Sequence, residues 1–144
     1  MTFTTAEAAR ITRLTQRQLQ WWDVRGYVKP ARTAKGRGGP DRVYSEANLL
    51  GLLVLQHLRE HGLRRNLIRK VTRSPNFTRL SEYCDGCLGT YYLNNGSWSG
   101  VAFNATELLQ LAVLHSPVIV VDVQALWERV QKAVEKKEAA NARC

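Results

Sequence analysis

The chain has 144 residues, a formal net charge of +9 and a hydrophobic content of 44%. This length suits one domain or two small ones, and the apolar content excludes a disordered polycation. Because we find no signal peptide and no apolar run long enough to span a bilayer, we expect a cytoplasmic protein that does not engage a membrane.

The positive charge is concentrated in the first half of the chain. Residues 1–79 hold 16 Lys or Arg against 5 Asp or Glu, a net +11, whereas residues 80–144 hold 5 against 7, a net −2. A basic half joined to a nearly neutral half is typical of a nucleic-acid-binding module with an appended region. We therefore predict a domain over residues 1–72 and a small α+β domain over residues 73–144, a candidate dimerisation or effector region.

Two capped helices are predicted at the N-terminus. Thr4 and Glu7 have the spacing of a capping box, and residues 15–18 repeat this pattern. Two short helices joined by a tight turn form a helix-turn-helix. Gly26 suits the left-handed position that closes the second helix.

A hairpin wing and two more helices are expected next. Residues 33–41 are rich in glycine and predict a long loop, flanked by strand-like residues at 27–28 and 42–44. Ser45 is placed to cap an apolar, central helix that Gly62 ends. Residues 63–71 predict a short basic helix.

The second half of the chain differs from the first in that it contains hairpin dipeptides and strand-favouring segments. Asp-Gly at 85–86 and Asn-Gly at 95–96 are hairpin dipeptides, and the residues around 91–93 and 98–103 favour strands. A helix capped by Asn104, a strand at 118–121 and a last helix capped by Asp122 follow. The predicted fold class is α+β, with a winged helix-turn-helix followed by a small hairpin and helix domain.

Residues 3–71 resemble the DNA-binding domain of the MerR family of bacterial transcription regulators. The resemblance rests on five segments in order: Phe-Thr-Thr-Ala-Glu-Ala-Ala-Arg-Ile at 3–11, Leu-Gln-Trp-Trp-Asp at 19–23, Gly-Tyr-Val-Lys-Pro at 26–30, Arg-Val-Tyr-Ser at 42–45 and Leu-Arg-Glu-His-Gly-Leu at 58–63. It implies a nucleoid-associated regulator that binds a palindromic promoter site in double-stranded DNA as a homodimer. It also implies distortion of that site, with RNA polymerase as a partner at the promoter.

The chain departs from the family pattern in two places. Gln20-Trp21-Trp22 stands where family members usually have an arginine followed by two tyrosines. Ser74-Pro75 and a β-rich segment replace the long helix through which family members dimerise. An apolar stripe on the last helix either packs on its own sheet or, as we slightly favour, forms a substitute dimerisation surface: Val123, Leu126, Trp127, Val130 and Val134.

Arginine pairs well with guanine and glutamine with adenine, and basic wing residues can reach the minor groove or phosphates. The predicted DNA-binding residues are Gln16, Arg17, Gln18, Gln20 and Trp21 in the second helix and Lys35, Arg37, Arg42 and Tyr44 in the wing. Trp21 is equally compatible with a place in the core, where we also expect Trp22. The basic residues of the 63–71 helix either flank the duplex or form a solvated face.

Cys84 and Cys87 are weak candidates for metal ligands. One Cys-x-x-Cys supplies two ligands where a structural zinc site needs four, so the Asp-Gly turn between them is the better interpretation. Cys144 has no assignable role, and we predict no metal and no cofactor. The sequence also lacks a nucleophile–base constellation, so an enzyme is not predicted. The alternatives are an architectural or excisionase-like DNA-binding protein and a protein-interaction module.

Overall fold

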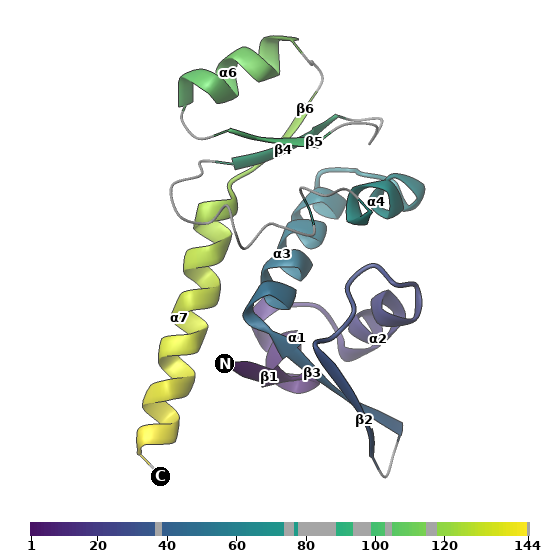
Figure 1. Ribbon diagram of the computed structural model, residues 1–144, viewed down its shortest axis with the longest axis vertical. Helices are drawn as coiled ribbons and strands as arrows, with labels where there is room; N and C mark the ends of the chain where they lie inside the picture. The colour runs from purple at the N-terminus through teal and green to yellow at the C-terminus, as the bar shows by residue number, and fades with distance from the viewer. Residues whose placement is uncertain are drawn as a thin grey trace.

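The computed structural model describes residues 1–36, 39–73, 77, 89–93, 99–102, 105–114 and 118–143. Its first elements are β1 (Thr2–Thr4), α1 (Thr5–Thr12), α2 (Gln16–Val24), β2 (Arg32–Gly36), β3 (Gly39–Ser45), α3 (Glu46–Glu60) and α4 (Arg65–Thr72). The chain continues through β4 (Gly89–Leu93), β5 (Ser99–Ala102), α6 (Ala105–Leu114), β6 (Val118–Val121) and α7 (Val123–Ala142). Helices combine with two three-stranded antiparallel sheets, which confirms the predicted α+β class (Figure 1).

The first two helices begin at the predicted caps. The Thr4 hydroxyl accepts a hydrogen bond from the Glu7 backbone N–H at 3.2 Å, and the Glu7 carboxylate accepts one from the Thr4 N–H at 2.7 Å. Thr15 and Gln18 repeat this reciprocal arrangement at 3.1 and 2.8 Å. Arg13, in the left-handed region at φ 61°, ends α1 so that α2 starts almost at once. The helix-turn-helix is therefore confirmed.

Gly26 closes α2 as predicted, with φ 74°. Its N–H donates to the Asp23 carbonyl and the Tyr27 N–H donates to the Trp22 carbonyl, a pairing that satisfies the last carbonyls of the helix. Tyr27 and Val28 then enter the core rather than a sheet, each less than 10% exposed. The prediction that the first wing strand starts at residues 27–28 is wrong, because β2 begins at Arg32.

The wing is a longer hairpin than the sequence suggested. Strands β2 and β3 pair from Arg32 opposite Val43 to Gly36 opposite Gly39, so most of the predicted loop at 33–41 is strand. Strand β1, which was not predicted, adds a third strand to the outer side of β3 and sets Phe3 opposite Tyr44. Pairing between distant residues thus supplies order that the glycine-rich composition conceals.

Helix α3 is the central helix, as predicted. Ser45 caps it, Gly62 follows its end at φ 89°, and its leucines at positions 49, 50, 52, 53, 55 and 58 are at most 1% exposed. Such burial on most of the circumference is typical of a core helix. Helix α4 confirms the predicted short basic helix.

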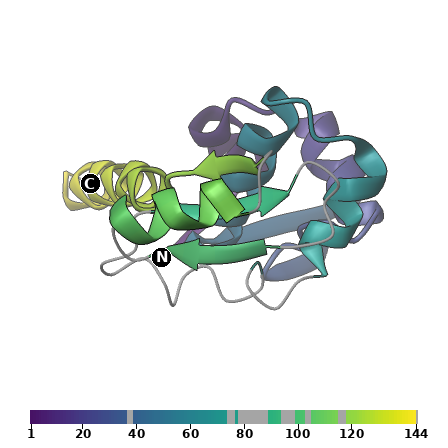
Figure 2. The same ribbon diagram turned by 90° about the horizontal axis from the view of Figure 1, so that it is seen from above.

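In the second half, the predicted strands and helices are confirmed where the structure describes them. The sheet has the order β5-β4-β6, and α6 lies over the face of the sheet that points away from α3 (Figures 1 and 2). The Asp122 carboxylate caps α7 by accepting from the Ala125 N–H at 3.0 Å. None of the described helices has the length and hydropathy needed to cross a membrane.

Helix α7 runs beside α3 and packs on the N-terminal half of the chain (Figure 1). Val123, Val130 and Val134 are buried in the same core as α3, with Leu126 and Trp127 packed against it. The Arg129 guanidinium also donates to the Ile11 carbonyl at 2.8 Å, at the end of α1. The chain thus uses much of this stripe for its own core, and the predicted dimerisation role of the stripe stays a prediction.

Candidate nucleic-acid interface

The outer face of α2 is a solvent-exposed stripe of side chains suited to base edges. Arg17, Gln20 and Val24 are spaced by three and four residues, so they share one face of the helix, and all three are exposed. Gln16 is exposed beside them at the first turn. Val24 is 78% exposed and was not among the predicted contacts. The stripe combines guanidinium and amide groups with an apolar tip, as major-groove readers do.

The remaining predicted residues of α2 have structural partners. The Gln18 amide oxygen is engaged by the Thr15 N–H in the capping box. Trp22 lies in the core, as expected, at 2% exposure. Trp21 is half-buried, with its ring in edge-to-face contact with Tyr27 at a centroid distance of 5.7 Å. Gln18 and Trp21 are both half-buried and retain some solvent-accessible surface next to the exposed stripe.

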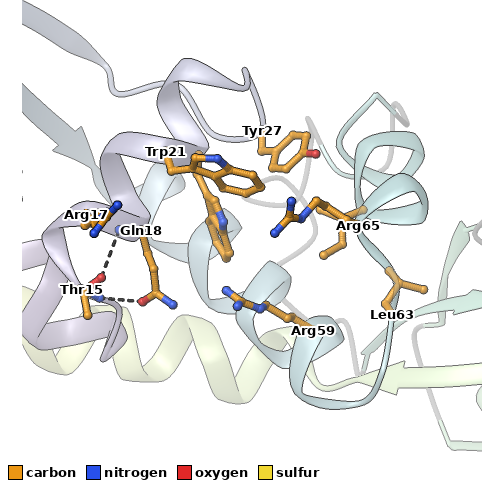
Figure 3. Close-up of a pocket in the computed structure, with 10 residues that line it drawn as sticks. Thr15, Arg17, Gln18, Trp21, Tyr27, Arg59, Leu63 and Arg65 are labelled. Atoms are coloured by element: carbon orange, nitrogen blue, oxygen red, sulfur yellow. Dashed lines mark hydrogen bonds between the residues drawn. The ribbon is translucent and has the colours of Figure 1, made fainter.

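A hollow of about 500 Å³ opens between α2 and the α3–α4 junction (Figure 3). Arg17 of α2, Arg59 near the end of α3 and Arg65 at the start of α4 line it. The other lining residues are polar or form the edge of the core: Thr15, Gln18, Trp21, Trp22, Tyr27, Leu63 and Ile68. Three arginines from three helices therefore surround one hollow.

Trp21 forms part of the wall of this hollow and supports two of the basic groups. The Arg65 guanidinium carbon lies 4.7 Å from the centroid of the Trp21 ring, and that of Arg25 lies at 5.1 Å. A guanidinium over an indole face is held by a cation–π attraction, which limits its freedom without neutralising its charge. The indole thus keeps Arg65 close to α2.

Acidic neighbours are missing from the hollow as far as the structure describes it. No Asp or Glu lines it, and none of the described ion pairs involves Arg17, Arg59 or Arg65. Three guanidinium groups without an acidic partner among the described residues create a positive potential and offer planar sets of N–H donors that match phosphate oxygens. The arrangement is suited to a phosphate group held at the edge of the exposed α2 stripe.

Among the predicted wing contacts, the structure describes the side chain of Arg42 but not those of Lys35 and Arg37. Lys35 lies in β2, although its side chain is outside the described residues, as is Arg37. Arg42 is not a free cation, because its Nε donates to the Asp23 carboxylate at 2.6 Å and its side chain is only 10% exposed. In this conformation Arg42 is therefore engaged within the protein, and its predicted DNA contact stays untested.

Tyr44, which was also predicted to contact DNA, is buried in the core. It is 0% exposed, and its hydroxyl has no hydrogen-bond partner among the described residues. Burial raises the pKa of this phenol above its ordinary value; nearby Arg42 opposes the rise and Asp23 adds to it. A hydroxyl enclosed in the core is out of reach of a phosphate.

Arg59 and Asp23 were not among the predicted site residues. For Arg65 the sequence left DNA binding and a solvated helix face equally compatible. The signal for Arg42 was its position two residues before Tyr44, since residues two apart in a strand share a face. Cys84, Cys87 and Cys144, the weak metal candidates and the unassigned thiol, lie outside the described residues.

Comparison with known proteins agrees with this geometry. The family model described as MerR HTH family regulatory protein matches residues 3–74, half of the chain. A comparison with curated protein sequences returned no match. The matched segment contains α1, α2, the wing, α3 and α4, which together build the exposed stripe and the arginine-lined hollow. The chain belongs to the MerR family of helix-turn-helix regulatory proteins and carries its DNA-binding domain.

Proposed function

We propose that this protein is a sequence-specific transcription regulator. In this proposal a homodimer binds a palindromic promoter site in double-stranded DNA, distorts the duplex and so changes its use by RNA polymerase. One helix-turn-helix covers too few base pairs for high specificity, so two copies on two half-sites are expected. Distorting the duplex adds specificity at base pairs that the protein does not contact.

The observation that carries the proposal is the exposed α2 stripe beside the arginine-lined hollow. Insertion of α2 into the major groove brings Arg17 and Gln20 towards base edges. The same docking brings a backbone phosphate towards Arg59 and Arg65, which lie across the hollow from α2. Base contacts would then specify the sequence while phosphate contacts fix the position of the helix.

The role of residues 73–144 as a separate dimerisation or effector domain stays a prediction. The surface that joins the two copies is left open, because the apolar stripe of α7 is used within the chain. An effector would act on DNA binding through α7, which hydrogen-bonds to α1 through Arg129 and packs on α3.

The proposal is tested by selecting DNA with the purified protein. Sheared genomic DNA is incubated with the protein at physiological salt, and the retained fragments are sequenced. We expect enrichment of one or a few palindromes, lost on Arg17→Ala, because a bidentate arginine–guanine contact is worth about 1 to 3 kcal/mol. Arg143→Ala, which removes the same charge from the exposed end of α7, serves as the control and should retain the enrichment.

Uniform recovery of all fragments, lost as the salt concentration rises, would contradict a sequence-specific regulator. That result would instead support the architectural or excisionase-like alternative, in which the same headpiece binds along DNA without choosing a promoter.

A further inference from the structure

The Asp23–Arg42 ion pair joins two elements that must meet DNA together. Asp23 lies in the last turn of α2, and Arg42 lies in β3, the wing strand that also pairs with β1. The Nε–Oδ2 distance is 2.6 Å, and the two side chains are only 10% and 19% exposed. A short, charge-assisted hydrogen bond in a shielded site is stronger than a solvent-exposed ion pair.

Little else holds α2 against the wing. Among the described residues, this is the one side-chain hydrogen bond between α2 and the β2–β3 hairpin, and the two elements otherwise make few contacts. Strand β3 is anchored elsewhere, through its pairing with β1 and the buried Tyr44 side chain. The ion pair therefore connects the last turn of α2 to a strand that the core already fixes.

The direction of Arg42 follows from the strand. Arg42 and Tyr44 are two residues apart in β3 and share its inward face, so the guanidinium faces the protein and not the solvent. A charge directed inward requires a partner, because burying it alone is very costly. Asp23 supplies the partner, and the bond fixes the distance between the last turn of α2 and the wing.

We infer that Asp23 and Arg42 are positioning residues: their ion pair sets the angle of the wing to the recognition helix, so that both fit one duplex. This inference rests on the proposed function. Neither side chain contacts DNA in this account, which separates Arg42 from the exposed Arg17. Loss of either partner frees the wing angle and weakens the specific complex more than the non-specific one.

The test is a double-mutant cycle with Asp23→Asn, Arg42→Gln and the double variant. Affinity is measured by fluorescence anisotropy for the selected palindrome and for a scrambled duplex of equal length, over a series of salt concentrations. We expect each single variant to lower the ratio of specific to non-specific affinity about tenfold. The double variant should lose no more than either single variant, and the salt dependence should stay unchanged.

A direct phosphate contact by Arg42 gives a different pattern. Arg42→Gln alone would then weaken binding to both duplexes and reduce the salt slope by about one, while Asp23→Asn would leave affinity unchanged or raise it. That pattern overturns the positioning role, and so does an unchanged affinity ratio in both variants. Tyr44→Phe, which removes a buried hydroxyl near the pair, is the control and should bind like the unmodified protein.

The experiment also distinguishes a variant that does not fold from one that has lost the positioning role. If a neutral variant fails to fold by circular dichroism, the charge-exchanged double variant Asp23→Arg, Arg42→Asp replaces it, because it keeps an ion pair between α2 and β3 but removes the cation from the wing. A preserved affinity ratio in this variant supports the inference, and a lowered ratio together with a shallower salt slope overturns it. Failure of the unmodified protein to prefer any duplex overturns the proposed function and, with it, the inference; failure in the variants alone to lower the ratio overturns only the inference.

Discussion

Replacing Arg17, Arg59 and Arg65 together with glutamine is expected to lower affinity for the selected DNA about 100-fold at about 0.15 M salt. These side chains line one hollow without a described acidic partner. If Arg59 and Arg65 each neutralise one phosphate charge while Arg17 contacts a base edge, the slope of log affinity against log salt becomes shallower by about 1.8. Titrations at four or five salt concentrations measure both quantities.

A charge-matched control separates the hollow from general basicity. Arg69, Lys70 and Arg73 are exposed at the end of α4 and do not line the hollow. Changing these three to glutamine removes the same charge but should leave most of the affinity. Equal losses in the two triple variants would show that net charge alone drives binding and would refute a dedicated phosphate site.

Val130→Asp is expected to lower the free energy of unfolding by about 3 to 5 kcal/mol, since it buries an unpaired carboxylate. Val130 is fully buried where α7 packs on the core shared with α3. Because this contact lies within one chain, the change should be independent of protein concentration. Urea unfolding followed by circular dichroism at two concentrations tenfold apart measures it.

Ala139→Asp is the control on the same helix. Ala139 is exposed, so the variant should unfold within about 0.5 kcal/mol of the unmodified protein. If Val130→Asp instead left unfolding unchanged and converted a dimer to a monomer in sedimentation, the α7 stripe would be a dimer interface after all. That outcome would contradict the packing of α7 described above.

Local chemistry explains which elements were predictable from the sequence. Capping boxes at Thr4 and Thr15, the cap at Ser45 and the closing Gly26 depend on residues three or four positions apart, so their spacing is visible in the chain. The same holds for Asp122 and α7. Because these caps mark where α1 and α2 begin and end, the helix-turn-helix could be predicted from them.

Contacts between distant residues explain what was missed. Strand β1 is three residues long and exists through its pairing with β3, some 40 positions later. The glycines of the wing suggested a loop, yet the hairpin ladder extends to Gly36 and Gly39. No local pattern identifies β1, or the far end of a glycine-rich hairpin, before the partner strand is known.

The residues of the candidate site likewise fall into those predictable from local spacing and those that depend on contacts between distant residues. The exposed residues Gln16, Arg17 and Gln20 follow from helical periodicity alone. The pairing of Arg42 with Asp23, 19 positions away, depends on how the wing folds over α2. Likewise, the periodicity of α7 identifies an apolar face, but only the fold decides that its partner is α3 of the same chain.

In the proposed complex, α2 and the arginine-lined hollow form the DNA-binding surface. The most direct measurement is a titration of ¹⁵N-labelled protein with the selected duplex, followed by amide chemical shifts. We expect the largest shifts in α2, the wing and the α3–α4 junction around Arg59 and Arg65, with the shifts of α6 nearly unchanged. Large shifts confined to α6 or to the exposed face of α7, with no shifts in α2, would show that DNA binds elsewhere.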